Sequence, residues 1–219
     1  MKTSATLLTT ALLASPLTAL AVQSNYTYVE GDFVAHGEAE TRFGGFRSEE
    51  DYDGYGFKGS IDITPNLFIE SSYDELDADN NGGELELFSG GLGLRAPIGD
   101  NANPLDIYGV ATYESLEEND GSGIEADGFG VTGGLRWQAT PTLEINPYAS
   151  YLDYGEIDNS NADLDGMRFG VDGVLNVNET FALTAGYRTT KLDIEGPGGD
   201  ASLDLENEIR LGGRIYLTK

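Results

Sequence analysis

Few residues in this sequence are of the types that perform covalent catalysis. Among 219 residues there is no cysteine and a single histidine, His36. A serine hydrolase needs a serine and an acid arranged around its histidine, but the sequence has neither a G-x-S-x-G motif nor a His-x-Ser pair. A protease that pairs its histidine with an aspartate two residues earlier is not indicated either, because that position is Val34. We therefore predict a protein that is not an enzyme, with His36 at the rim of a loop.

Calcium binding is a second candidate chemistry, in the segment DADNNGGELELF at residues 77–88. Asp77, Asp79 and Asn81 fit the first ligand positions of a D-x-[DN]-x-[DN]-G loop. The twelfth position is Phe88, where such a loop needs a bidentate glutamate. Asp, Asn and Gly are also the residues that turns between strands favour. We predict a turn here, with no metal and no cofactor, and keep calcium as the alternative.

Charged residues form the third candidate set. Acids outnumber bases 38 to 12, and the formal net charge of −26 argues against a basic patch for nucleic acid. Many of the bases nevertheless lie at alternate positions in segments whose other positions are apolar. Arg136, for example, lies between Leu135 and Trp137. This period of two indicates β-strands with one charged and one apolar face.

Alternation of this kind extends over most of the chain after residue 22, and no amphipathic stretch of helix length interrupts it. Ten strands are predicted, at about residues 24–36, 54–63, 67–76, 84–96, 105–116, 126–138, 143–154, 166–177, 181–191 and 205–217. Short connections alternate with longer ones that are rich in glycine and acids, such as residues 37–53.

The short connections recur regularly. Pro65, Pro104, Pro141 and Glu179 are 39, 37 and 38 residues apart. A unit of about 38 residues with two strands, one short turn and one long loop is a hairpin repeated around a sheet. A propeller blade of similar period would need four short strands per unit, so the repeat favours a sheet of long hairpins.

Strand length favours a membrane barrel over a soluble one. Strands of about eleven residues are long enough to cross a bilayer at a tilt. Several strands also carry aromatic residues near their ends, as interfacial girdles do: Tyr55, Tyr73, Tyr113, Trp137, Tyr151 and Tyr187. Strands in lipid must close into a barrel, because every backbone group has to be paired. We predict an all-β, ten-stranded antiparallel up-and-down transmembrane β-barrel over residues 22–219, with eight strands as the alternative. A soluble periplasmic β-protein is the competing class.

The first 21 residues have the features of an export signal. Lys2 provides a positive head, an apolar stretch follows, and Ala19-Leu20-Ala21 is a small-x-small cleavage site. A membrane anchor is the competing interpretation, but the stretch contains several threonines and Pro16. We predict a signal peptide at residues 1–21 that is cleaved after Ala21.

With these features, residues 22–219 resemble the small outer-membrane β-barrel proteins of Gram-negative bacteria. The segment NYTYVEGDFV, residues 25–34, is similar to the start of the diffusible-signal-factor-regulated (Ax-type) outer-membrane barrel family. The resemblance implies an outer-membrane location, insertion by the barrel assembly machinery, periplasmic tight turns and extracellular long loops. Such proteins usually end on an aromatic residue, whereas this chain ends RIYLTK, with Tyr216 three residues before the end.

In such a barrel the apolar face meets lipid and the charged face lines the lumen. The charged residues predicted to face the lumen are Glu30, Asp32, Lys58, Glu70, Asp74, Arg95, Glu114, Arg136, Glu144, Arg168, Arg188, Arg210 and Arg214. Acidic strands then lie beside basic ones, and opposite charges are expected to pair between neighbours. Because a confined charge is costly unless it is paired, we predict a filled, cross-linked interior. A narrow polar channel is the alternative.

The predicted function is that of a monomeric, non-enzymatic barrel with a structural or surface-interaction role, through acidic extracellular loops. Its expected partners are membrane lipid, lipopolysaccharide and, during insertion, the barrel assembly machinery, with no nucleic acid. A small porin-like diffusion channel is the alternative function.

Overall fold

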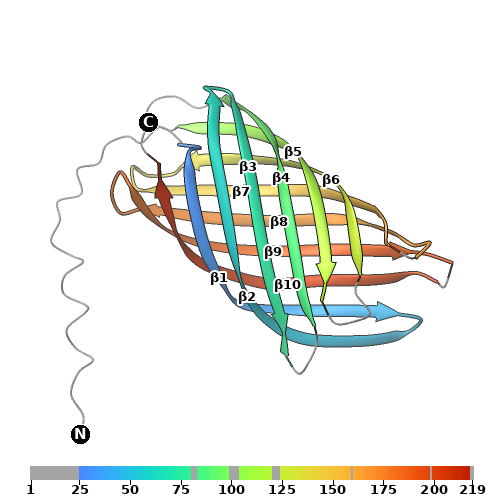
Figure 1. The fold of residues 1–219 in the computed structure, drawn as a ribbon. Helices are drawn as coiled ribbons and strands as arrows, with labels where there is room; N and C mark the ends of the chain where they lie inside the picture. Colours follow the sequence, from blue (N-terminus) through green and yellow to red (C-terminus); the bar gives the residue numbers. More distant parts are fainter. Residues whose placement is uncertain are drawn as a thin grey trace, which may run out of the picture.

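The computed structural model describes residues 25–79, 83–98, 104–119, 124–158, 160–197 and 199–217. They form ten antiparallel strands, and because β1 pairs with β10 the sheet closes into a barrel (Figure 1). The strands are β1 (Tyr28–Phe43), β2 (Phe46–Thr64), β3 (Leu67–Ala78), β4 (Glu84–Pro97), β5 (Leu105–Glu118), β6 (Glu125–Gln138), β7 (Leu143–Glu156), β8 (Asp163–Asn176), β9 (Phe181–Glu195) and β10 (Ala201–Tyr216). The ten-stranded prediction is confirmed, and the eight-stranded alternative is wrong. The predicted signal peptide, residues 1–21, lies outside the described residues.

Each strand pairs with the strand next to it in the chain, so the barrel has two distinct ends. At one end Tyr28 lies opposite Tyr216, and the Leu217 N–H donates to the Thr27 carbonyl at 3.0 Å. We call this the terminal end. At the other end β1 and β2 meet around Gly44 and Gly45, and we call it the hairpin end. No helix in the described residues is long and apolar enough to cross a membrane.

The β1–β2 hairpin is longer than the sequence predicts. The expected acidic loop at residues 37–53 is instead paired strand up to Phe43 and Phe46. The hairpin extends beyond the end of β3 and stays paired with β10 (Figure 1). Gly44 and Gly45 have φ of 55° and 90°, the left-handed values that two-residue hairpin turns require. The loop prediction was wrong because charges on both faces are typical of loops, yet a strand that extends beyond the lipid can carry them as well.

Loop lengths do not distinguish the two ends. The predicted long loops are mostly strand. What remains between strands at the hairpin end is residues 44–45, 79–83, 119–124, 157–162 and 196–200. At the terminal end the connection at residues 98–104 is longer than any of these. The expected asymmetry of loop length is therefore wrong. What distinguishes the hairpin end is how far its strands extend.

The outer face of the barrel is apolar. Large hydrophobic side chains from all ten strands are exposed there, including Phe33, Phe57, Ile69, Leu92, Ile107, Val131, Tyr151, Phe169, Leu183 and Leu211. Toward the hairpin end, tyrosine hydroxyl groups bond to polar residues: Tyr73 to Glu86, Tyr113 to Asp127, Tyr151 to Asp165 and Tyr187 to Asn207. An apolar ring with a polar tip is suited to a membrane interface. These tyrosines mark the edge of the lipid-facing surface.

Candidate functional site

The inward-facing side chains fill the barrel in three layers along its axis. Arginines and tyrosines occupy the terminal end, an ion-pair network surrounds a central cavity, and apolar side chains occupy the hairpin end. The structure places every residue of the predicted lumen set on this inner face, where each is buried or partly buried. The layers therefore show how these charges are accommodated.

The first layer is a column of alternating arginine and tyrosine side chains, which we call the Arg–Tyr stack. The guanidinium carbon of Arg95 lies 4.0 Å from the ring centre of Tyr26, and that of Arg136 lies 3.8 Å from the same ring. Arg136 is also 5.4 Å from the ring of Tyr28, over which Arg214 lies at 4.0 Å. Cation–π contacts of this kind contribute about 0.5–2 kcal/mol each. The stack crosses the lumen at the terminal end.

Acids neutralise the arginines of the stack. Arg214 Nε donates to Glu30 Oε2 at 2.6 Å, across the directly paired positions of β10 and β1. Arg95 Nη2 lies 3.1 Å from Asp62 Oδ1. The contact of Arg136 with Glu144 is longer, at 4.0 Å, although both side chains are almost completely buried. Arg136 therefore depends more on its two tyrosines than on its carboxylate.

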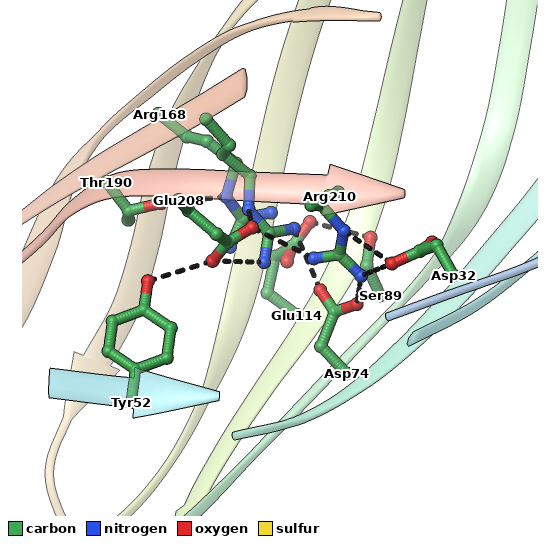
Figure 2. Close-up of polar contacts among 10 residues, drawn as sticks. Asp32, Tyr52, Asp74, Ser89, Glu114, Arg168, Thr190, Glu208 and Arg210 are labelled. Atoms are coloured by element: carbon green, nitrogen blue, oxygen red, sulfur yellow. Dashed lines mark hydrogen bonds and ion pairs between the residues drawn. The ribbon is translucent and has the colours of Figure 1, made fainter. Parts of the chain in front are cut away.

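The second layer is a network of ion pairs in the middle of the barrel (Figure 2). Arg210 Nη2 lies 2.5 Å from both Asp32 and Asp74. Arg188 Nη1 donates to the second oxygen of Asp74 at 2.8 Å, and its Nε lies 2.6 Å from Glu208. Asp74 is on β3, whereas Arg188 and Arg210 are on β9 and β10. Pairing between neighbouring strands alone is therefore wrong, because Asp74 pairs with arginines across the lumen.

A polar cavity of about 100 Å³ adjoins this network, a volume sufficient for a few water molecules. Lys58 lies 3.5 Å from Glu70 in its wall. Glu114 accepts hydrogen bonds from the hydroxyls of Ser89 and Thr112. Arg168 Nε donates to the Thr190 hydroxyl at 3.2 Å. The cavity is thus lined by charges of both signs.

The third layer, which we call the apolar ring, lies inside the hairpin end. Its members are Val34, Tyr52, Leu76, Leu87, Leu116, Ala126, Leu152, Tyr154, Ile157, Leu164, Leu192 and Leu205. All of them are buried. The hydroxyl of Tyr52 joins the ring to the central network by donating to Glu208 at 3.0 Å. The ring therefore lies between the cavity and the outside of the barrel at the hairpin end.

The apolar ring was not predicted from the sequence, although a signal was present. Leu76, Leu116, Leu152 and Leu192 share the parity of the lumen charges on their strands, and each lies near the hairpin end. Asp172, which lines the cavity, also has the parity of Arg168 on β8. These residues could have been assigned to the inner face from parity alone, whereas their contacts depend on how the barrel closes.

Two other sequence predictions concern the outside of the barrel. Asp77 is exposed at the end of β3 and Asp79 follows it, while Asn81 lies outside the described residues. His36 does not share the lumen parity that its even number suggests. A bulge between Val34 and Gly37 shifts the register of β1, so Val34 is buried inside while His36 is exposed on the outer face.

A closed barrel with an apolar outer face and a filled lumen defines an integral outer-membrane protein of the small-barrel class. The chain belongs to the family described as the outer membrane protein beta-barrel domain, whose model matches residues 5–212. This places the protein in the outer membrane of a Gram-negative bacterium. A search of curated proteins finds no match.

Solved outer-membrane structures resemble the chain at low identity. Neisserial surface protein A is 12% identical, with a TM-score of 0.40, and the match covers 87% of this chain and 96% of that one. Ail, the attachment invasion locus protein of Yersinia pestis, is 10% identical with a TM-score of 0.35, over 86% of this chain and 99% of that one. The CymD monoaromatic hydrocarbon channel is 9% identical with a TM-score of 0.35, over 90% of each chain.

Proposed function

We propose that the protein is a closed, non-enzymatic barrel with a structural or surface-interaction role, carried by its acidic hairpin end. The observation behind this proposal is the filled lumen. The Arg–Tyr stack occupies the terminal end and the apolar ring the hairpin end, with the cavity between them. A solute crossing the barrel would have to disrupt buried ion pairs or leucine packing, and both are costly.

In this proposal the hairpin end faces the cell exterior and the terminal end faces the periplasm. The protein is exported by a signal peptide that is removed after Ala21, is inserted as a monomer by the barrel assembly machinery and belongs with the Ax-type barrels. The outer part of the β1–β2 hairpin is rich in acids, among them Glu38, Glu40, Glu49, Glu50 and Asp51. Such a surface is suited to lipopolysaccharide and the divalent ions around it.

Planar-bilayer recording tests the closed barrel directly. The refolded wild-type protein should give no discrete conductance steps. The positive control is a variant in which both the Arg–Tyr stack and the apolar ring lose side chains. It combines Tyr26→Ala with Leu116→Ala and Leu152→Ala, and it should conduct. Steps in the wild type at the same protein concentration would contradict the proposal.

A small diffusion channel is the second candidate, and the central cavity is the observation that favours it. The cavity is polar and lined by Lys58, Arg168 and Asp172, as the middle of a narrow pore would be. For a channel, the wild type conducts, and Arg168→Ala shifts its ion selectivity toward cations. Arg168 is the informative position because its guanidinium bonds to a hydroxyl group, so its removal leaves the ion pairs of Arg188 and Arg210 intact.

A further inference from the structure

Three side chains that could coordinate a metal converge on the outer surface of the β1–β2 hairpin. They are His36 and Glu38 of β1 and Asp51 of β2, and one donor atom from each lies within 4.8 Å of the others. His36 Nε2 is 3.6 Å from Glu38 Oε1, and Glu38 lies directly opposite Asp51 in the antiparallel pair. His36 is the one histidine of the chain, and its imidazole lies beside two carboxylates.

A local irregularity of the fold creates this arrangement. With regular pairing, His36 would point into the lumen on the parity of Asp32. The bulge instead inserts an extra residue between Val34 and Gly37. Gly37 takes the inward position, where an added Cβ would collide with the ring of Tyr52, and His36 turns outward beside Glu38. Bulges often occur where a side chain must be re-aimed next to a functional site.

A neighbouring strand orients one of the carboxylates. Asn207 of β10 donates its amide to Glu38 Oε2 at 2.5 Å and accepts from the Tyr187 hydroxyl at 3.1 Å. Among the described non-glycine residues, Asn207 alone has a positive φ, of 53°. The amide holds one oxygen of Glu38, and the other oxygen faces His36. Hydrogen bonds of this kind to a ligating carboxylate are the usual support of a metal site.

The negative charges of the cluster are not neutralised by a neighbouring lysine or arginine among the described residues. Like charges directly opposite each other on paired strands are destabilising, and Glu38 faces Asp51 in this way. On the other side of Glu38, Glu206 has its own cation, because Lys191 Nζ lies 3.0 Å from it. In the described part of the chain, no lysine or arginine lies within ion-pair distance of Asp51. A bound cation would offset the repulsion between Glu38 and Asp51.

We propose that His36, Glu38 and Asp51 form a surface site for a divalent transition-metal ion, with Zn²⁺ as the best fit. One imidazole and two carboxylates are typical zinc ligands, at about 2.0–2.2 Å, and water completes the coordination on the exposed side. Tetrahedral ligands at that distance lie roughly 3.4 Å apart, so small rotations of these exposed side chains bring the donors together. Ca²⁺ and Mg²⁺ are disfavoured because they prefer oxygen ligands throughout.

The ion would join β1 to β2 at the point where β2 separates from β3. Beyond this point β2 loses one neighbour, because its pairing with β3 begins at Tyr52 while residues Phe46–Asp51 pair with β1 alone. Arg42 and Arg47, two trypsin sites, lie in this outer part. Metal binding at its base therefore stiffens the hairpin and slows cleavage at both arginines.

The test uses the full-length mature protein, refolded in detergent and stripped of metal with a chelator. Zn²⁺ is titrated calorimetrically, and tryptic cleavage after Arg42 and Arg47 is followed with and without Zn²⁺. The variants are His36→Ala, Asp51→Asn and Asn207→Gly, which keeps the positive φ but removes the amide. Asp53→Asn is the matched control, because it removes an exposed acid two residues along β2. The heat-modifiable gel shift verifies that each variant is folded.

We expect one equivalent of Zn²⁺ to bind the wild type and the Asp53→Asn control alike, and to slow cleavage in both. His36→Ala and Asp51→Asn should weaken binding by more than about tenfold, and Asn207→Gly by about tenfold. A thousandfold excess of Ca²⁺ should not displace Zn²⁺. Unchanged zinc affinity in His36→Ala, the absence of a stoichiometric site in the wild type, or displacement by Ca²⁺ would each overturn the proposal. If His36→Ala does not fold, Asp51→Asn and Asn207→Gly decide in the same way.

Discussion

At the scale of single residues, Arg136 is the centre of the terminal end. Its side chain is 2% exposed and lies between the rings of Tyr26 and Tyr28, with an added hydrogen bond to the Tyr28 hydroxyl at 3.0 Å. A guanidinium can fill this space because it is planar and can stack on two aromatic faces, which the ammonium of lysine cannot do. Its carboxylate partner, Glu144, is equally buried.

Replacing Arg136 should therefore destabilise the barrel. Arg136→Ala removes the cation–π contacts with Tyr26 and Tyr28, each worth about 0.5–2 kcal/mol, and leaves Glu144 with Arg214, at 3.7 Å, as its cation. We expect its heat-modifiable gel shift to occur at a lower temperature than in the wild type, with Arg136→Lys intermediate. Arg47→Ala, in the exposed hairpin, is the control. Equal transition temperatures for Arg136→Ala and the wild type would mean that the stack does not hold the terminal end together.

Outside the membrane, Glu40 joins two strands as Arg136 joins the side chains of the terminal end. The hydrogen bond from Arg42, supported by the charge of Arg47, lowers the pKa of the Glu40 carboxyl below its ordinary value. A lowered pKa in the folded state stabilises the hairpin above the unfolded pKa of about 4.3, and the contribution is lost as the pH falls through the folded value. The carboxylate thus ties Arg42 of β1 to Arg47 of β2.

Hydrogen exchange of the hairpin amides tests this role. At pH 7, Glu40→Gln should exchange faster than the wild type at the amides around Phe43 and Phe46, after correction for intrinsic rates. As the pH falls through the lowered pKa of Glu40 in the folded state, the two proteins should become alike, because the wild-type carboxylate is then protonated. Equal protection at pH 7 would show that Glu40 does not contribute to the stability of the hairpin.

At the scale of elements, glycines recur with the same period as the hairpins. Gly54, Gly91, Gly128 and Gly166 are 37, 37 and 38 residues apart. At each position an added Cβ would overlap with a backbone carbonyl of the next strand. They lie on the even-numbered strands β2 to β8, where a neighbouring backbone approaches closely. A glycine at such a point lets a strand bend as a small barrel requires.

Gly128 and Gly133 form a matched pair on β6 that tests this requirement. A Cβ at Gly128 would meet the Asp153 carbonyl, whereas one at Gly133 would meet nothing within 4 Å. Gly128→Ala should destabilise the barrel by about 1–3 kcal/mol, the usual cost of overpacking, and Gly133→Ala should be nearly neutral. Denaturant titration of the refolded variants measures both. Similar midpoints for the two variants would contradict a packing role for the repeated glycine.

How far the sequence predicts these elements depends on where they lie. Inside the lipid, alternation is strict, so the strand centres and the inward face of Arg136 or Arg210 could be assigned. Beyond the lipid both faces are polar, and the paired residues 37–53 were taken for a loop. A bulge leaves no signal in a period of two, so His36, predicted at the rim of a loop, lies instead within β1 on its outer face.

Contacts between side chains inside the lumen were harder to predict than the face of the strand on which each side chain lies. The partners of Arg214 and Glu30 follow from pairing of neighbouring strands, as expected. Asp74 instead meets Arg188 and Arg210 across the barrel, which depends on strand number and tilt once the sheet closes. The leucines of the apolar ring carry no charge, so the pattern of charged residues that indicates the lumen does not include them.

At the scale of the whole molecule, the two ends of the barrel differ in chemistry. The terminal end contains both described chain ends and the Arg–Tyr stack. The hairpin end contains the apolar ring, the tyrosine hydroxyls of the membrane edge and the extended acidic hairpin. An even number of strands places both chain ends on one side of the membrane. The orientation of the barrel therefore decides whether the acidic hairpin meets the medium or the periplasm.

Epitope insertion in cells determines this orientation. An epitope between Gly44 and Gly45, at the tip of the hairpin, should be accessible to antibody on intact cells. An epitope between Asn178 and Glu179, in the turn between β8 and β9 at the terminal end, should be detected only after permeabilisation. Both insertions fall in short connections outside the paired strands, so both proteins should keep the heat-modifiable gel shift. Trypsin added to intact cells should likewise cleave the unmodified protein after Arg42 or Arg47. Accessibility of the Asn178 epitope on intact cells, with protection of the Gly44 epitope, would reverse the orientation and place the acidic hairpin in the periplasm.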